Sequence, residues 1–146
     1  MKKISVNRIL LTGLVFAIVA QILNTVGAFL TMSYYLIPQY FPVWSRLMMP
    51  TAGPPPMSFY FLSLLFGFVA GTLFALVYTL IKGSLPKPLW LRGIYYGLLV
   101  FLVGGIPGYL SMMLLINLPF GLIAFWAFEG LVIYLINGII TAAINK

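Results

Sequence analysis

The stretch 57-MSFYFLSLLFGFVAGTLFALVYTLI-81 contains no charged side chain. About 20 apolar residues in a helix cross a hydrocarbon core of about 30 Å, so this segment is long enough to be a transmembrane helix. Working outward from it, three further stretches meet the same criterion, at roughly residues 9–32, 89–115 and 119–144. The chain is therefore expected to be an all-α membrane protein that forms a single transmembrane domain over residues 1–146.

The composition agrees with this expectation and excludes several classes of function. Hydrophobic residues make up 63% of the chain and charged residues 6%, against about one quarter charged in a soluble domain. The absence of histidine and cysteine excludes zinc sites, iron–sulfur clusters, His-ligated haem and Cys- or His-based nucleophilic catalysis. No cofactor is expected. The net charge of +7 does not indicate nucleic acid, because the basic residues lie at the ends of apolar runs.

The connections between the spans predict an up-down four-transmembrane-helix bundle. The third connection, around "INLPF", and the second, "KGSLPKP", are short enough to join antiparallel neighbours. Only the first, residues 33–56, is long, and it is rich in aromatic residues and proline. Trp44 and Arg46 lie in this loop. It has two interpretations, an anchor at the membrane interface, as is usual for aromatic belts, or a lid or docking surface.

The basic residues predict the orientation. Arg46 is alone on the loop 33–56 side, whereas the other side holds the remaining seven, Lys2, Lys3, Arg8, Lys82, Lys87, Arg92 and Lys146. Cytoplasmic loops carry the excess of Lys and Arg, so both termini are expected to be cytoplasmic and the loop 33–56 to lie outside. The expected location is a cell inner membrane, crossed several times, with the lipid bilayer as the first partner.

Small residues are expected to mark the helix contacts, since lipid removes the hydrophobic drive between helices. Two spans carry such residues at four-residue spacing, Ser63, Gly67, Gly71 and Ala75 in one and Gly93 and Gly97 in the next. Contacts within one chain can use all of these stripes, and a homodimer through an unused face stays open. Pro107, flanked by glycines, predicts a helix kink, with an ion-binding break in the helix as the alternative.

Polar residues at membrane depth form the candidate site. With a rise of 1.5 Å per residue, Glu129 lies about 15 Å into its span, and Gln21 and Asn24 come to a similar height from the other side. Glu129 is the only acidic side chain of the chain. An ionised carboxylate at this depth is costly unless it is protonated, paired or hydrated. A neutral Glu129 can form hydrogen bonds with Gln21 or Asn24, but the shared height does not determine whether Glu129 faces Gln21.

This carboxylate has two interpretations. It can be a hydrogen-bonding residue that holds two helices together, a proton- or cation-coupling site, or both.

The methionines raise a separate possibility, a copper site, because all six beyond the initiator fall in the outer half: Met32, Met48, Met49, Met57, Met112 and Met113. Thioethers suit Cu(I), but methionine also fills irregular gaps, and no metal site is predicted.

The segment 67-GFVAGTLFALVYTLIKGSLPKPLWLRGIYYGLLVFLVGGIP-107 resembles a family of small uncharacterised bacterial four-helix integral membrane proteins. The resemblance covers mainly the second and third spans. It implies four spans and a bacterial inner membrane, and it supplies no catalytic residue.

Together these features predict a small polytopic membrane protein that is not an enzyme. Its expected role is that of an accessory or interaction protein. The alternative is a small solute or ion transporter, oligomeric, with Glu129 as the coupling site. An enzyme acting on lipid ranks third, because a lone carboxylate without a base, a nucleophile pair or a metal supplies little chemistry.

Overall fold

A computed structural model describes residues 5–146, and within them all regular structure is helical. Lys2 and Lys3, on which part of the predicted orientation depends, lie outside the described residues. The elements in chain order are α1 Val6–Leu30, α2 Met32–Tyr35, the 3₁₀ helix η1 Pro38–Val43, α3 Met57–Ile81, the 3₁₀ turn η2 Lys82–Ser84, α4 Leu89–Val100, the π-helical turn η3 Phe101–Gly105, α5 Ile106–Leu115 and α6 Phe120–Ile144.

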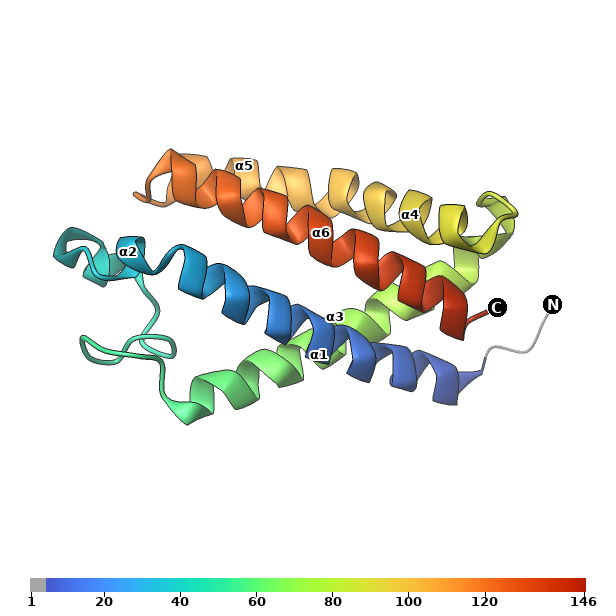
Figure 1. Cartoon of the computed structure of the whole chain (residues 1–146), viewed down its shortest axis with the longest axis horizontal. Coiled ribbons are helices and arrows are strands. Elements are labelled where there is room, and N and C mark those ends of the chain that lie inside the picture. The colour runs from blue at the N-terminus through green and yellow to red at the C-terminus, as the bar shows by residue number, and fades with distance from the viewer. Residues whose placement is uncertain (1–4) are drawn as a thin grey trace.

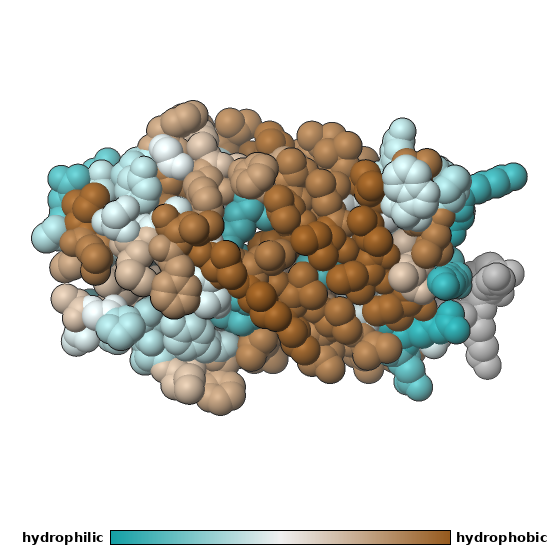
Figure 2. Space-filling model, in the orientation of Figure 1, coloured by the Kyte–Doolittle hydropathy of each residue, from teal (hydrophilic) through white to brown (hydrophobic). Residues whose placement is uncertain are grey.

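Four helices are long and apolar enough to cross a membrane: Val6–Leu30, Met57–Ser84, Leu89–Leu115 and Phe120–Ile144. Their bounds lie within a few residues of the predicted spans. Figure 2 shows a broad hydrophobic band across the middle of the molecule, with hydrophilic residues gathered at its two ends. This distribution is the one that a multi-pass membrane protein requires.

The helices pack as two antiparallel pairs, α1 with α3 and α4 with α6, and α1 and α6 join the pairs (Figure 1). We call the end that holds Ser5 and Lys146 the terminus end and the opposite end the loop end. The pairs converge at the terminus end. Toward the loop end, α3 diverges from α5, and the two lie at opposite edges of the molecule. The predicted four-helix bundle is therefore open on one side.

Glycines set both close helix contacts. Gly67 and Gly71 of α3 face α1, where a Cβ on Gly71 would lie 2.5 Å from the Cβ of Phe16. Gly93 and Gly97 of α4 face α6, where a Cβ on Gly97 would lie 2.2 Å from the carbonyl oxygen of Tyr134. Ala75, in the same stripe as Gly71, is fully buried. In lipid, such close backbone approach gains dispersion contacts that larger residues would prevent.

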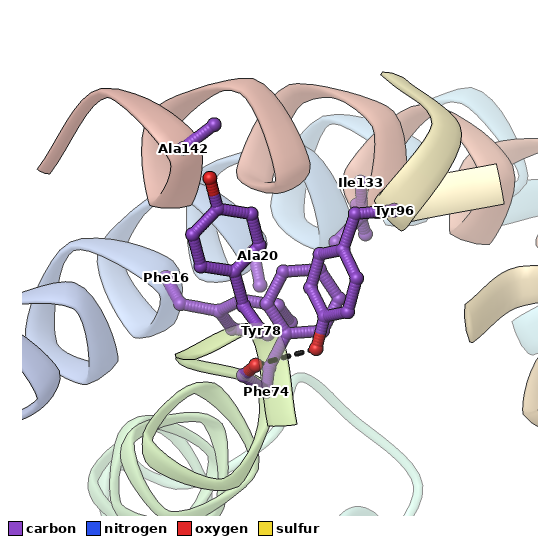
Figure 3. Packing of buried hydrophobic residues seen from close by; sticks show 7 residues of the cluster. All are labelled: Phe16, Ala20, Phe74, Tyr78, Tyr96, Ile133 and Ala142. Carbon is purple, nitrogen blue, oxygen red and sulfur yellow. Dashed lines mark hydrogen bonds between the residues drawn. The ribbon is translucent and has the colours of Figure 1, made fainter. Parts of the chain in front are cut away.

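An aromatic cluster joins the two pairs (Figure 3). The ring of Phe74 lies 4.5 Å from that of Tyr96 and 5.3 Å from that of Phe16, between ring centroids. The Tyr96 hydroxyl donates a hydrogen bond to the backbone carbonyl of Phe74. Nearer the terminus end, the side-chain amide of Asn145 donates to the Thr12 hydroxyl at 2.8 Å and fixes α6 against α1.

The irregular segment of the third span lies one turn before Pro107. Proline has no N–H and its ring crowds the preceding turn, so the backbone there cannot keep regular α-helical hydrogen bonds. The chain widens into the π-helical turn η3 and resumes as α5, with Pro107 in its first turn. Phe101 consequently packs against Gly105, where a Cβ would lie 2.7 Å from the Phe101 ring.

The glycine contacts predict that a Gly→Ala change destabilises the protein only where a neighbouring helix lies close to the glycine. Gly97→Ala should lower the free energy of unfolding by about 1–3 kcal/mol, because the added Cβ meets the backbone of α6. Gly108→Ala is the matched control, since no heavy atom lies within 4 Å of a Cβ at that position. Thermal unfolding in detergent micelles, followed by circular dichroism, measures both. Equal melting temperatures for the two variants would contradict the close contact.

Candidate functional site

Glu129 lies in the middle of α6, and its carboxylate faces α1. The register of the two helices is set at two points, by Asn145 against Thr12 and by Glu129 against Gly27. This register places Gln21 six residues, or about 9 Å, nearer the terminus end than the carboxylate. Asn24 is three residues, or about 4.5 Å, away in the same direction.

No hydrogen bond joins Glu129 to Gln21 or Asn24 among the described residues. Glu129 Oε1 is buried without a hydrogen-bond partner, and so is Gln21 Oε1. The Gln21 amide instead donates to the Thr25 hydroxyl at 3.5 Å, within its own helix. Asn24 is exposed. The height match was therefore off by about one turn for Asn24 and by nearly two turns for Gln21.

Gly27 is the residue that admits the carboxylate. A Cβ at this position would lie 2.2 Å from Glu129 Oε1 and 2.6 Å from Oε2, so both oxygens occupy the space that any larger side chain would fill. Gly27 is buried, and its carbonyl accepts a hydrogen bond from the Thr31 hydroxyl at 2.8 Å. The side chain of Glu129 therefore lies in a notch of α1 that exists only because residue 27 is glycine.

Three aromatic rings lie on the loop-end side of this notch. Tyr35, just after α1, lies 4.9 Å from Trp44 of the loop, between ring centroids, and Trp44 lies 6.3 Å from Trp126 of α6. Trp126 precedes Glu129 by three residues, so the two share a face of α6. We call Gly27, Tyr35, Trp44, Trp126 and Glu129 the Glu129 cluster.

Among these rings, Tyr35 is close enough to the Glu129 carboxylate for the two groups to interact electrostatically. The Tyr35 hydroxyl lies near the side chains of Thr31 and Trp126. Burial raises the pKa of Tyr35 above its usual value of 10.0, the neighbouring Thr31 and Trp126 side chains act in the opposite direction, and the nearby Glu129 carboxylate adds to the rise. Trp44 Nε1 is buried and has no hydrogen-bond partner. The two residues singled out in the outer loop therefore differ in burial. Trp44 packs into the cluster, whereas Arg46 is exposed.

A groove adjoins the cluster on its other side, where α3 diverges from α5 and α6. Its volume is about 340 Å³. Polar groups from four helices line it, namely Gln21 and Asn24 of α1, Ser63 of α3, Tyr109 of α5 and Tyr134 of α6. A second hollow of about 340 Å³ between α3 and α4 shares Phe16, Ala70 and Tyr134 with it. Of the predicted packing stripe, Ser63 therefore lines a groove, and Gly67 contributes to both the groove and the contact with α1.

Tyr109 connects the groove to the cluster. Its hydroxyl lies over Gly130, where a Cβ would be 2.2 Å from the Tyr109 oxygen. Gly130 follows Glu129 directly and is buried. The carboxylate therefore lies between the aromatic rings at the loop end and the groove at mid-depth.

Within the part of the chain that the structure describes, no group of three or more His, Cys, Asp or Glu side chains comes together. A conventional metal site would have to use other donors. Glu129 offers one carboxylate, and its chemistry is that of hydrogen bonding, proton exchange or pairing with a cation.

Sequence reasoning missed Gly27, Trp126 and Tyr109 as neighbours of Glu129. The sequence does show that Trp126 precedes Glu129 by three residues and that Gly130 follows it directly. The role of Gly27 was not, because it depends on the register between α1 and α6. Comparison with family models, with curated proteins and with solved structures finds no match for this chain.

The notch predicts strong coupling between residues 27 and 129. Gly27→Ala should lower the free energy of unfolding by about 1–3 kcal/mol, because the new methyl group overlaps the carboxylate. In a Glu129→Ala background the same change should cost little, since the space is then vacated. A double-mutant cycle of thermal unfolding measures the coupling. The same loss in both backgrounds would show that the carboxylate does not occupy the notch.

Proposed function

We propose that this chain is an accessory or interaction protein of a bacterial inner membrane, with both termini cytoplasmic, and that it is not an enzyme. Seven of the eight basic residues belong to the terminus side of the predicted topology, which supports this orientation. The four apolar helices support a multi-pass membrane location.

The observation that carries the proposal is the groove at mid-depth. Asn24 is exposed there, on a helix long enough to cross a membrane, and Gln21 Oε1 is buried without a partner. Lipid tails offer no hydrogen bond, so these amides gain from a polar group brought by a neighbouring helix. Ser63, Gly67 and Ala70 leave room on α3 for close backbone approach. The groove therefore suits a transmembrane helix that carries a small or polar residue, from a partner protein or from a second copy.

Site-specific photo-crosslinking in cells tests this proposal. A photoreactive residue at position 63, in the groove, should give one discrete protein adduct, whereas the same residue at position 61 should label lipid. Phe61 is the matched control because it lies on the same helix and its side chain is 69% exposed. Asn24→Leu should reduce the adduct from position 63 about threefold to fivefold, as expected for one interhelical hydrogen bond of about 1 kcal/mol.

Two results would count against a partner helix. One is lipid labelling alone from both positions, and the other is an adduct whose yield does not change in Asn24→Leu. The size of the adduct separates the two kinds of partner, because a second copy adds the 16.2 kDa of this chain.

We also propose, as a second candidate, a small solute or ion transporter, oligomeric, with Glu129 as the coupling site. Its support is specific. Glu129 Oε1 is buried without a hydrogen-bond partner, and no basic side chain of the described residues pairs with it. A carboxylate that only locked two helices together would be expected to form an interhelical hydrogen bond.

Labelling with a hydrophobic carbodiimide tests the second candidate. Glu129 is the only side-chain carboxylate, so peptide mass spectrometry assigns the adduct once it is separated from the C-terminal carboxyl. The rate of labelling should fall as the pH rises, because the reagent attacks the protonated carboxyl, and a transported cation should protect the residue. Glu129→Gln serves as the unlabelled control. A carboxyl that stays unreactive at every pH at which the protein is folded would leave only the packing role.

A further inference from the structure

We propose that the Glu129 cluster binds a small organic ammonium ion that carries an oxygen acceptor, such as an amino alcohol. The juxtaposition that carries this proposal is one carboxylate beside three aromatic rings, Tyr35, Trp44 and Trp126, at the loop end of α1 and α6.

When ionised, Glu129 can supply both a negative charge and a free oxygen to such a ligand. Glu129 Oε1 is shielded from solvent and accepts no hydrogen bond within the described residues. Arg46, two residues beyond Trp44, is exposed and does not pair with the Glu129 carboxylate. A cation placed against this oxygen would satisfy the acceptor and the charge together.

The rings favour an organic cation. Trp and Tyr faces attract ammonium groups, and several aromatic rings around one site are the usual means of binding methylated amines. Trp44 contacts both other rings, at 4.9 Å from Tyr35 and 6.3 Å from Trp126. It lies between η1 and α3, outside the long helices.

The oxygen donors are too few for a hard metal ion. Ca²⁺ takes about six to eight oxygen ligands and Mg²⁺ about six. The cluster supplies the two carboxylate oxygens of Glu129 and the Tyr35 hydroxyl, while the nearby Thr31 hydroxyl already donates to Gly27. The chain has no second acidic side chain.

Trp44 Nε1 narrows the class of ligand further. It is a buried N–H donor without an acceptor among the described residues. A ligand with an ammonium group for Glu129 and an oxygen for this N–H would satisfy both, whereas a simple alkylammonium would leave the donor unpaired. Free ethanolamine or choline and the headgroup of an aminophospholipid share this chemistry.

The inference names the class of solute for the proposed transporter. It rests on that proposed function only for transport, because binding of the ammonium ion to the Glu129 cluster is measured separately. The groove and its partner helix do not enter it. If the protein binds the ammonium ion but does not carry it into vesicles, the binding site stands and the proposal of a transporter fails.

Tryptophan fluorescence of the protein in phosphatidylglycerol nanodiscs tests the site. Trp90→Phe leaves Trp44 and Trp126 as the only reporters, because the chain has three tryptophans. Titration with ethanolamine or choline should give a saturable change that sodium chloride at the same ionic strength does not give. Glu129→Gln should weaken binding about tenfold or more, since the ammonium loses its counter-charge. Trp44→Phe should reduce the preference for choline over tetramethylammonium, because only choline can use the indole N–H.

Nanodiscs that contain phosphatidylethanolamine distinguish the two sources of ligand. If a lipid headgroup fills the site, these nanodiscs should show the changed fluorescence before titration, and free ethanolamine should bind more weakly. If the source is a free amine, the titration should not depend on the lipid. A response equal to that of sodium chloride in the Trp90→Phe protein would overturn the proposal. So would unchanged binding in a folded Glu129→Gln variant.

Discussion

Close approach of helix backbones at glycine residues is the constraint on which this structure depends. Lipid tails are as apolar as the side chains, so helices associate through dispersion contacts and hydrogen bonds instead of through burial from water. In each helix pair, a Cβ at the contact glycines would overlap a neighbouring helix, as at Gly71 against Phe16 and at Gly97 against Tyr134. The aromatic cluster around Phe74 and the hydrogen bond between Asn145 and Thr12 then hold the two pairs together toward the terminus end.

The same constraint explains where the molecule is open. Gly104 and Gly108, in the third span, have no heavy atom within 4 Å of a Cβ, and α3 diverges from α5 along this part of the chain. The groove with its polar lining lies where helix pairing ends, and the Glu129 cluster lies between this groove and the loop. Binding of a partner helix in the groove and binding of a cation in the cluster would use neighbouring surfaces of α6, through Gly130 and Glu129.

The sequence predicted the four spans closely, because a run of about 20 apolar residues is a strong local signal. It identified Glu129 as the unusual residue, and it predicted that Gly67, Gly71, Gly93 and Gly97 would mark contacts. It did less well on the neighbours of Glu129. Matching heights along straight helices selected Gln21 and Asn24, but the observed register places Gly27 against the carboxylate and leaves Asn24 exposed. The sequence left the long loop as an interfacial anchor or as a lid or docking surface, and it did not indicate that Trp44 packs against Tyr35 and Trp126.

The sequence by itself thus determined that the chain forms four apolar helices long enough to cross a membrane, and that its one acidic side chain lies within the last of them. Both properties follow from composition along a continuous stretch of chain. Only the tertiary structure decided what that carboxylate contacts. Periodicity gives a residue its face and approximate height on one helix, whereas the contact between Gly27 and Glu129 depends on tilt, rotation and register between helices about a hundred residues apart.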